Sequence, residues 1–323
     1  MTSQSINTQE IIKEINELRK RRNALILAHN YQIPEIQDIA DYVGDSLGLS
    51  KQAALSDKET IVFCGVHFMA ETAAIFSPHK TILIPDLQAG CSLAASIDMD
   101  ELKKWKKKYP NAVVVSYVNT TAEVKSQSDY CCTSTNAVTV VNAIPKDKQI
   151  LFVPDMFLGQ YVAKMTGRNI IIYPGECHVH ARVRFSDMQA KLKQYPNSDF
   201  LIHPECGCVT NCMHHLSAGD LDKDSTYILS TGGMVKHAKK SSKKQFVVAT
   251  EIGMLYPLKR ENPEKEFIPL RSDMVCEYMK MIDLPKLRDA LKFLQYRVEV
   301  PQKIAKKAYI PIKRMYEISN IKV

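Results

Sequence analysis

The sequence predicts an α/β protein made of three similar α/β/α units with parallel sheets. Three observations support this fold class. Ten apolar runs of strand length recur along the chain, helical patterns separate them, and similar phrases return after about 86 residues. Most runs are unbroken rather than alternating, which is typical of parallel strands that helices cover on both faces.

The expected strands are the ten apolar runs, at 24–28, 60–64, 81–85, 112–118, 149–153, 169–173, 199–203, 226–230, 245–249 and 266–270. An N-terminal helix at about 8–22 carries apolar residues on one face, namely Ile11, Ile12, Ile15 and Leu18. Helices at about 285–295 and 302–318 are expected to close the assembly.

Repeated phrases divide the chain. KKYPNAVVVSYVN (107–119) resembles KQYPNSDFLIHPE (193–205), and RRNALILAHNY (21–31) is a weaker third copy. Units therefore start near residues 23, 111 and 197. We expect a first unit with the N-terminal helix at 1–109, a second at 110–195, a third at 196–290, and a C-terminal helical segment at 291–323 that packs on them.

Composition narrows the function classes. The 323 residues are 45% hydrophobic and 24% charged, as in ordinary globular proteins, and the net charge is +8. The basic runs 103–109 and 236–244 do not alternate with stacking aromatic residues, so we expect no nucleic-acid partner. The N-terminal residues lack the apolar core of a signal peptide, and no apolar run approaches the roughly 20 residues of a membrane span. We expect a cytoplasmic protein without a membrane partner.

Polar, titratable residues follow the first strand of each unit. These strands run into AHNYQ (28–32), SYVNT (116–120) and HPEC (203–206). Ligands of parallel sheets bind beyond the carboxyl ends of the strands, so the sequence predicts one shared site. The side chains expected there are His29, Tyr31, Tyr117, Asn119, His203 and Glu205.

Hydroxyl residues stand before helical patterns at three further places. Ser46 lies in GDSLGLS, Ser134 in CTSTNAV, and Ser230 and Thr231 in STGGM. Hydroxyls and backbone N–H groups at helix N-termini bind anions, although simple helix capping is the alternative for each. The chain contains neither GxGxxG nor GxxxxGK[ST], so no bound dinucleotide or nucleoside triphosphate is expected.

Three of the nine cysteines occupy matching places. Cys91, Cys177 and Cys276 each follow the last strand of a unit by a few residues. Three thiolates on a common axis suit an iron–sulfur cluster with one open iron, or alternatively a zinc ion with water in the fourth position. The compact set Cys206, Cys208 and Cys212 is the rival metal site, but its CxCxxxC spacing fits neither zinc ribbons nor ferredoxins.

The chain resembles the quinolinate synthase family from about residue 10 to the C-terminus. The motifs that carry the resemblance are AHNYQIPEIQDIADYVGDSLGLS (28–50), SYVNTTAEVK (116–125), CCTSTNAV (131–138), GECHVH (175–180), HPEC (203–206) and STGGM (230–234). The resemblance implies three homologous three-layer α/β/α units in a pseudo-threefold arrangement. It also implies condensation of iminoaspartate with dihydroxyacetone phosphate to quinolinate in de novo NAD biosynthesis, with loss of phosphate and water.

The resemblance further implies a non-redox [4Fe–4S] cluster with an open iron, held by Cys91, Cys177 and Cys276. His203 and Glu205 then form the acid–base pair, and Tyr31 transfers protons and gates the site. The expected substrate-binding residues are His29, Ser46, Tyr117, Asn119, Ser134, Ser230 and Thr231. An aspartate oxidase or dehydrogenase must supply iminoaspartate, which is unstable in water.

Alternatives remain at this point. Cys206, Cys208 and Cys212 are expected to pack in the core, to form a regulatory disulfide or to bind a second metal, in that order. His178 and His180 are interpreted either as supports for the cluster ligands, an interpretation favoured for His180, or as packed residues. The rival functions are another non-redox iron–sulfur hydro-lyase, and a cluster- or zinc-binding regulatory protein that binds nucleic acid through its basic runs.

Overall fold

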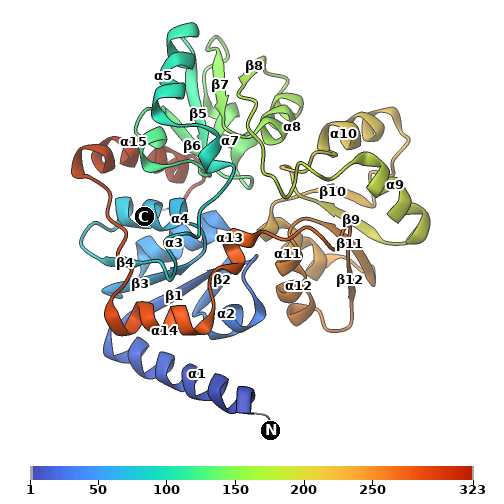
Figure 1. Cartoon of the computed structure of the whole chain (residues 1–323). Helices are drawn as coiled ribbons and strands as arrows, with labels where there is room; N and C mark the ends of the chain where they lie inside the picture. The colour runs from blue at the N-terminus through green and yellow to red at the C-terminus, as the bar shows by residue number, and fades with distance from the viewer. Residues whose placement is uncertain (1–2, 322–323) are drawn as a thin grey trace.

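Three four-stranded parallel sheets form the frame of the protein (Figure 1). The computed structural model describes residues 3–321, and its sheets share one strand order, in which the first strand of each unit lies between the second and the third. The strands of the first sheet are β1 (Ala24–His29), β2 (Tyr42–Gly44), β3 (Thr60–Cys64) and β4 (Thr81–Leu83). Those of the second are β5 (Val113–Tyr117), β6 (Tyr130–Cys132), β7 (Ile150–Val153) and β8 (Ile170–Ile172). Those of the third are β9 (Asp199–Ile202), β10 (Thr226–Ile228), β11 (Gln245–Ala249) and β12 (Glu266–Pro269).

The helices repeat with the same order. A helix leads into the first strand of each sheet: α1 (Ser3–Arg21), α5 (Met99–Lys108) and α9 (Phe185–Gln194). Within the units follow α2 (Pro34–Ile39), α3 (Ser46–Leu55), α4 (His67–Phe76), α6 (Ala122–Lys125), α7 (Ala137–Ala143), α8 (Met156–Thr166), α10 (Val209–Ala218), α11 (Thr231–Lys240) and α12 (Leu255–Glu261). Short 3₁₀ turns occur at Ala94–Ser96 and Ile252–Met254, and the chain closes with α13 (Glu277–Lys280), α14 (Leu284–Phe293) and α15 (Gln302–Ile318). The three repeated α/β units predicted from the sequence are confirmed.

The ten predicted strands are present, but β2 and β6 were missed. Each of these is a three-residue edge strand whose sequence, YVG or YCC, lacks the adjacent aliphatic residues found in the runs around the equally short edge strands β4, β8 and β10. The N-terminal helix also begins at Ser3 rather than near residue 8. Every residue of β3, β7 and β9 is buried, which explains why apolar residues follow one another there without alternation, after a polar first residue in β3 and β9.

Of the last two helices, α15 joins the first two units and α14 packs on the first. Helix α15 packs against α4 in the first unit and against α6, α7 and β6 in the second, whereas α14 packs on α1 and β3. The boundaries of the units stay a prediction. Residues 1–2 of the first predicted unit and residues 322–323 of the predicted C-terminal segment lie outside the described residues. No helix within residues 3–321 combines the length and apolar composition that a bilayer crossing requires.

One helix in each unit points its N-terminus towards the centre of the molecule and has a basic side chain at its other end. Lys80, just before β4, donates to the carbonyls of Ala53 and Ser56 at the end of α3. Lys265, just before β12, donates to the last carbonyls of α11 in the same way. In the second unit Arg168 donates to carbonyls at and beyond the end of α7. A cation at a helix C-terminus satisfies unpaired carbonyls and complements the helix dipole.

We predict that Lys265→Met destabilises the protein by about 1.5–3 kcal/mol, because it removes a charged donor and leaves buried carbonyls unpaired. The Lys265 ammonium lies 2.6 Å from the carbonyl oxygen of Ala238 and 2.8 Å from that of Ser241, and the residue is only 6% exposed. Urea unfolding measures the effect. Lys103→Met is the control, because Lys103 is half exposed and forms an ion pair with Asp100 on its own helix. Equal effects of the two substitutions would contradict the capping role.

Candidate active site

A cavity lies where the carboxyl ends of β1, β5 and β9 meet. Residues from all three units line it, as expected for ligand sites in parallel sheets. Of the residues predicted from the sequence, those that line the cavity are His29, Tyr31, Ser46, Cys91, Tyr117, Asn119, Ser134, Cys177, His203, Glu205, Thr231 and Cys276. Ser230 lies just outside, where its hydroxyl caps α11 by accepting from the N–H of Gly233.

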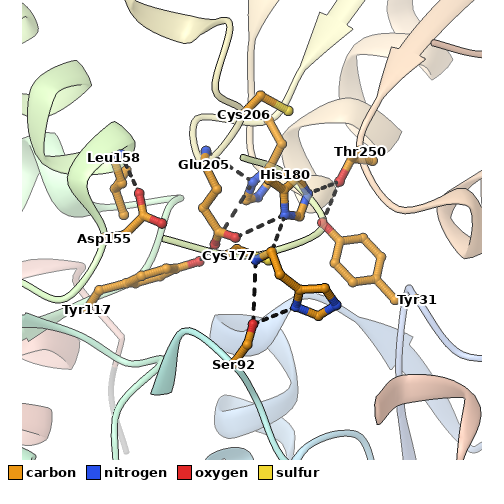
Figure 2. A network of polar contacts seen from close by, with 12 residues as sticks. Tyr31, Ser92, Tyr117, Asp155, Leu158, Cys177, His180, Glu205, Cys206 and Thr250 are labelled. Atoms are coloured by element: carbon orange, nitrogen blue, oxygen red, sulfur yellow. Dashed lines mark hydrogen bonds and ion pairs between the residues drawn. The ribbon is translucent and has the colours of Figure 1, made fainter. Parts of the chain in front are cut away.

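The carboxyl of Glu205 is the buried acid of this cavity (Figure 2). It is 4% exposed and accepts a short hydrogen bond from the hydroxyl of Tyr117 in the second unit. Tyr117 donates to Oε1 of Glu205, and His203 Nδ1 lies 4.0 Å from the same oxygen. The other carboxyl oxygen, Oε2, lies 3.3 Å from Nδ1 of His180. Burial raises the pKa of Glu205 to about 7, although the Tyr117 hydrogen bond opposes this shift. A carboxyl with this pKa both takes and gives protons near neutral pH.

His180 connects several of the groups around Glu205. Its Nδ1 lies 3.3 Å from Sγ of Cys177, and its Nε2 lies 2.9 Å from Oγ1 of Thr250. The same threonine oxygen lies 2.5 Å from the hydroxyl of Tyr31. A polar chain therefore runs from a cysteine of the second unit, through Thr250 of the third, to a tyrosine of the first (Figure 2).

Burial sets the charge of the histidines and tyrosines around the cavity. It lowers the pKa of His29 and of His180 to about 3, and it also lowers the pKa of His203. The three imidazoles are therefore neutral at physiological pH. Burial and the charge of Glu205 raise the pKa of Tyr31 and of Tyr117, so both phenols keep their protons as donors.

Polar groups of all three units meet at the wall formed by the N-termini of α3 and α11. Thr135 Oγ1 lies 3.0 Å from Oδ2 of Asp45 and 2.9 Å from the hydroxyl of Ser230. Asn30 donates to the hydroxyl of Thr231 over 3.0 Å. The three hydroxyl-bearing segments predicted to bind anions are thus brought together.

Asn119 is the amide of the cavity. Its Oδ1 is buried and has no hydrogen-bond partner among the described residues. An unpaired buried oxygen is costly, and a ligand that donates to it removes the cost.

The three repeat-related cysteines are half-buried free thiols on this cavity. Burial raises the pKa of Cys91 to about 12, that of Cys276 to about 11, and that of Cys177 as well. A cationic group is therefore needed to hold them as thiolates. Within residues 3–321, the one set of three ligand atoms that lies within 4.8 Å is that of Cys177, His180 and Glu205. The three sulfur atoms are not such a set, whereas thiolate ligands of a single zinc ion each lie about 2.3 Å from the metal and therefore within this limit of one another.

Cys206, Cys208 and Cys212 are buried in the core beneath the third sheet. The Cys206 thiol donates to the carbonyl of Ala249 over 3.0 Å, and Cys212 Sγ lies 3.1 Å from Sδ of Met188. None of the three lines the cavity. The thiol of Cys208 contacts those of Cys206 and Cys212, so packing, a disulfide and a second metal all stay predictions for these cysteines.

Sequence reasoning missed Thr250, Glu251 and Lys280. The carboxylate of Glu251 lies 3.0 Å from the ammonium of Lys280 and accepts from the N–H of Cys276. The Lys280 ammonium also donates to the carbonyl of Tyr31. Thr250 and Glu251 follow β11 directly, so the rule that selects residues after strand ends identifies them when it is applied to every strand.

Asp155 is a second buried acid near Glu205, and the sequence did not single it out. It is fully buried, and its Oδ1 accepts from the N–H of Leu158 at the start of α8 over 2.6 Å (Figure 2). Its Oδ2 has no partner among the described residues. Burial, followed by the charge of Glu205, raises the pKa of Asp155 well above its usual range.

The fold and the cavity define an α/β enzyme whose site is assembled from three repeated units. The sequence profile of the family described as Quinolinate synthetase A protein matches residues 13–317. The chain is 51% identical to quinolinate synthase of Thermus thermophilus over 310 residues, which cover 96% of this chain and 98% of that protein. It is 51% identical to the enzyme of Pyrobaculum aerophilum over 307 residues (95% and 99%) and 50% identical to that of Mycobacterium tuberculosis over 308 residues (95% and 88%). The chain belongs to the quinolinate synthase family.

We predict that Asp155→Asn stabilises the metal-free protein at about pH 8 more than at about pH 5. Because the folded-state pKa of Asp155 is raised, proton binding favours the folded state below that pKa, and this contribution is lost as pH rises through it. Asparagine stays neutral and keeps an oxygen for the helix cap, so it avoids the loss. Urea unfolding at both pH values tests this.

The control for Asp155→Asn is Asp98→Asn. Asp98 is exposed and caps α5 with the same geometry, since it accepts from the N–H of Glu101 over 2.7 Å. Its substitution is expected to show no such pH dependence. If the gain from Asp155→Asn is equal at both pH values, the buried carboxyl does not carry the effect.

Proposed function

We propose that this chain condenses iminoaspartate with dihydroxyacetone phosphate to form quinolinate, with release of phosphate and water, in de novo NAD biosynthesis. The observation that carries the proposal is the cavity that gathers titratable, hydroxyl and thiol side chains from three units. Membership of the quinolinate synthase family supports it. The reaction joins two anionic substrates and moves protons at several atoms, so it needs groups of all three kinds.

Glu205 and His203 serve as the acid–base pair of the proposed reaction. Glu205 has a pKa near 7 and is oriented by the hydroxyl of Tyr117, and neutral His203 lies beside it. Tyr31 keeps its phenolic proton and lies at the end of the chain through Thr250 and His180, so it is placed to deliver a proton from the first unit. Condensation and dehydration require protons to be both removed and supplied.

The hydroxyl and amide side chains hold the anionic ends of the substrates. Ser46 and Ser134 bind phosphate in this proposal, with Ser230 and Thr231 at the neighbouring helix N-terminus. Tyr117 and the unpaired oxygen of Asn119 orient the carboxylate-bearing substrate, the amide oxygen accepting from its protonated groups. His29, whose Nδ1 accepts from the N–H of Tyr31, presents a neutral ring to the same space.

Cys91, Cys177 and Cys276 hold a [4Fe–4S] cluster in this proposal. The donor set fits, because three thiols from three units face one cavity, are too dispersed for a single ion, and leave a fourth iron without a cysteine. The bound cluster supplies a Lewis acid that helps a substrate hydroxyl to leave. His180 contacts the Cys177 sulfur and holds its orientation.

The partners of this proposal are small molecules. An oxidase or dehydrogenase of aspartate must deliver iminoaspartate, because the imine hydrolyses in water. A nucleic-acid partner is not part of this proposal. The cytoplasmic location remains a prediction.

The cluster assignment predicts opposite results for the two cysteine sets. Replacing Cys206, Cys208 and Cys212 together by alanine should leave about four irons and four sulfides per chain after anaerobic reconstitution. Replacing Cys91, Cys177 or Cys276 by alanine should prevent stable loading. Analysis of iron and acid-labile sulfide on folded protein measures both. Loss of the cluster from the folded triple variant would place it at the CxCxxxC motif instead.

We predict that Glu205→Gln lowers turnover to quinolinate by roughly 10²–10⁴-fold, the usual contribution of a general acid–base group. Glutamine fills the same space and still accepts from Tyr117, but it cannot exchange a proton. Iron content should stay at the wild-type value, which separates chemistry from cluster binding. Full turnover of a cluster-loaded Glu205→Gln protein would show that the proton is moved elsewhere.

A further inference from the structure

The residue after each cysteine of the cavity belongs to one hydrogen-bonded chain. Ser92 follows Cys91 in the first unit, His178 follows Cys177 in the second, and Glu277 follows Cys276 in the third. The three positions are equivalent in the repeat, because each lies a few residues beyond the last strand of its sheet.

One imidazole spans the other two units. His178 Nδ1 lies 2.6 Å from the hydroxyl oxygen of Ser92, and His178 Nε2 lies 3.0 Å from Oε2 of Glu277. A carboxylate only accepts, so Nε2–H donates to Glu277; in the neutral ring Nδ1 then accepts from the Ser92 hydroxyl. The ring also meets Tyr278 edge to face, with centroids 6.0 Å apart.

The contacts lie at the half-exposed rim of the cavity. Ser92, His178 and Tyr278 line it, and the Glu277 side chain is 62% exposed. His180, two residues further along, points the other way, towards Glu205 and Thr250 in the buried centre. The two histidines beside Cys177 therefore serve different ends of the site.

Three cysteines that lie on three different units need contacts between the units to fix the distances between their sulfur atoms. Among the described residues no disulfide joins their loops, and each thiol is free. Rotation of one unit would move one sulfur relative to the other two. A side chain bonded to the neighbours of both other cysteines resists that movement.

We propose that Ser92, His178 and Glu277 form a clasp that holds the three cysteine loops at the spacing the cluster requires. His178 is its positioning residue, since it makes both links. This inference rests on the proposed cluster site, but the clasp is a property of the chain without metal. Breaking it at one unit loosens all three thiols.

Thiol reactivity in the metal-free, reduced full-length chain tests the clasp. Alkylation rates are measured for each cysteine by peptide mass mapping. His178→Ala should accelerate modification of Cys91 and Cys276, as well as Cys177, by roughly two- to fivefold, the range an exposed pair supports. Cys206, buried under the third sheet, should stay at its wild-type rate. A local packing role for His178 would accelerate Cys177 alone, and that result would overturn the proposal.

His215→Ala is the matched control. His215 Nδ1 lies 2.9 Å from Oδ2 of Asp220, and the side chains of this pair are 30% and 62% exposed, against 27% and 62% for His178 and Glu277. It lies away from the cavity, so its loss should leave the three rates unchanged. Glu277→Ala removes an exposed side chain that does not threaten folding, and it should accelerate Cys91 as well as Cys276. An unchanged Cys91 rate in this variant would also overturn the clasp.

Iron loss from the cluster-loaded protein separates the clasp from the proposed function. His178→Ala and Glu277→Ala should release iron to a chelator faster than wild type, within the same fold-range, and His215→Ala should not. If the wild-type chain binds no cluster, the proposed function fails, and the alkylation rates still decide the clasp. Equal iron loss from wild type and both clasp variants would contradict it.

Discussion

The buried carboxyl of Glu205 is the group that the rest of the site must accommodate. Burying an acid without partners is costly, and this one is 4% exposed. Its hydrogen-bond donor Tyr117 and the nearer imidazole, that of His180, come from the second unit, whereas Glu205 follows the first strand of the third, whose own His203 lies 4.0 Å away. The third unit therefore cannot satisfy its own acid. Docking of the units and completion of the site are one event, which explains why small units of this kind are found together.

The dipole of a helix adds a second constraint, because its two ends need groups of opposite polarity, and each of the three units meets this need in the same way. In each unit the helix that follows the second strand has its N-terminus at the cavity wall and a cation at its far end, provided by Lys80, Arg168 or Lys265. Hydroxyls at the near ends and cations at the far ends both complement the dipole. Part of the net charge of +8 is thus structural, and the charge alone is a poor guide to partners.

The sequence predicted those features of the fold and of the site that follow from the order of the strands and from the repetition of the unit. Buried parallel strands give long apolar runs, and the chain after each strand end must face the same edge, so His29, Tyr117 and Glu205 were predictable. Strands β2 and β6 were not, because their sequences, YVG and YCC, contain no adjacent aliphatic residues, unlike the runs around the equally short edge strands β4, β8 and β10. The contacts of His180 with Glu205 and Thr250 were not either, although its place beside the Cys177 thiol was favoured. They depend on how the second and third units pack, and spacing within GECHVH carries no record of Thr250.

The densest cluster of cysteines and histidines, at 203–215, shows why proximity in sequence misleads. His203 and Glu205 leave the strand towards the cavity, and the next residues turn into α10. A helical turn carries Cys208 and Cys212 under the third sheet, where apolar burial suits a small thiol. The cysteines that face the cavity are 86 and 99 residues apart, as are the clasp residues beside them. When a site is built from three repeated units, its residues are found by comparing equivalent positions of the units. A single compact motif contains only the site residues that its own unit contributes.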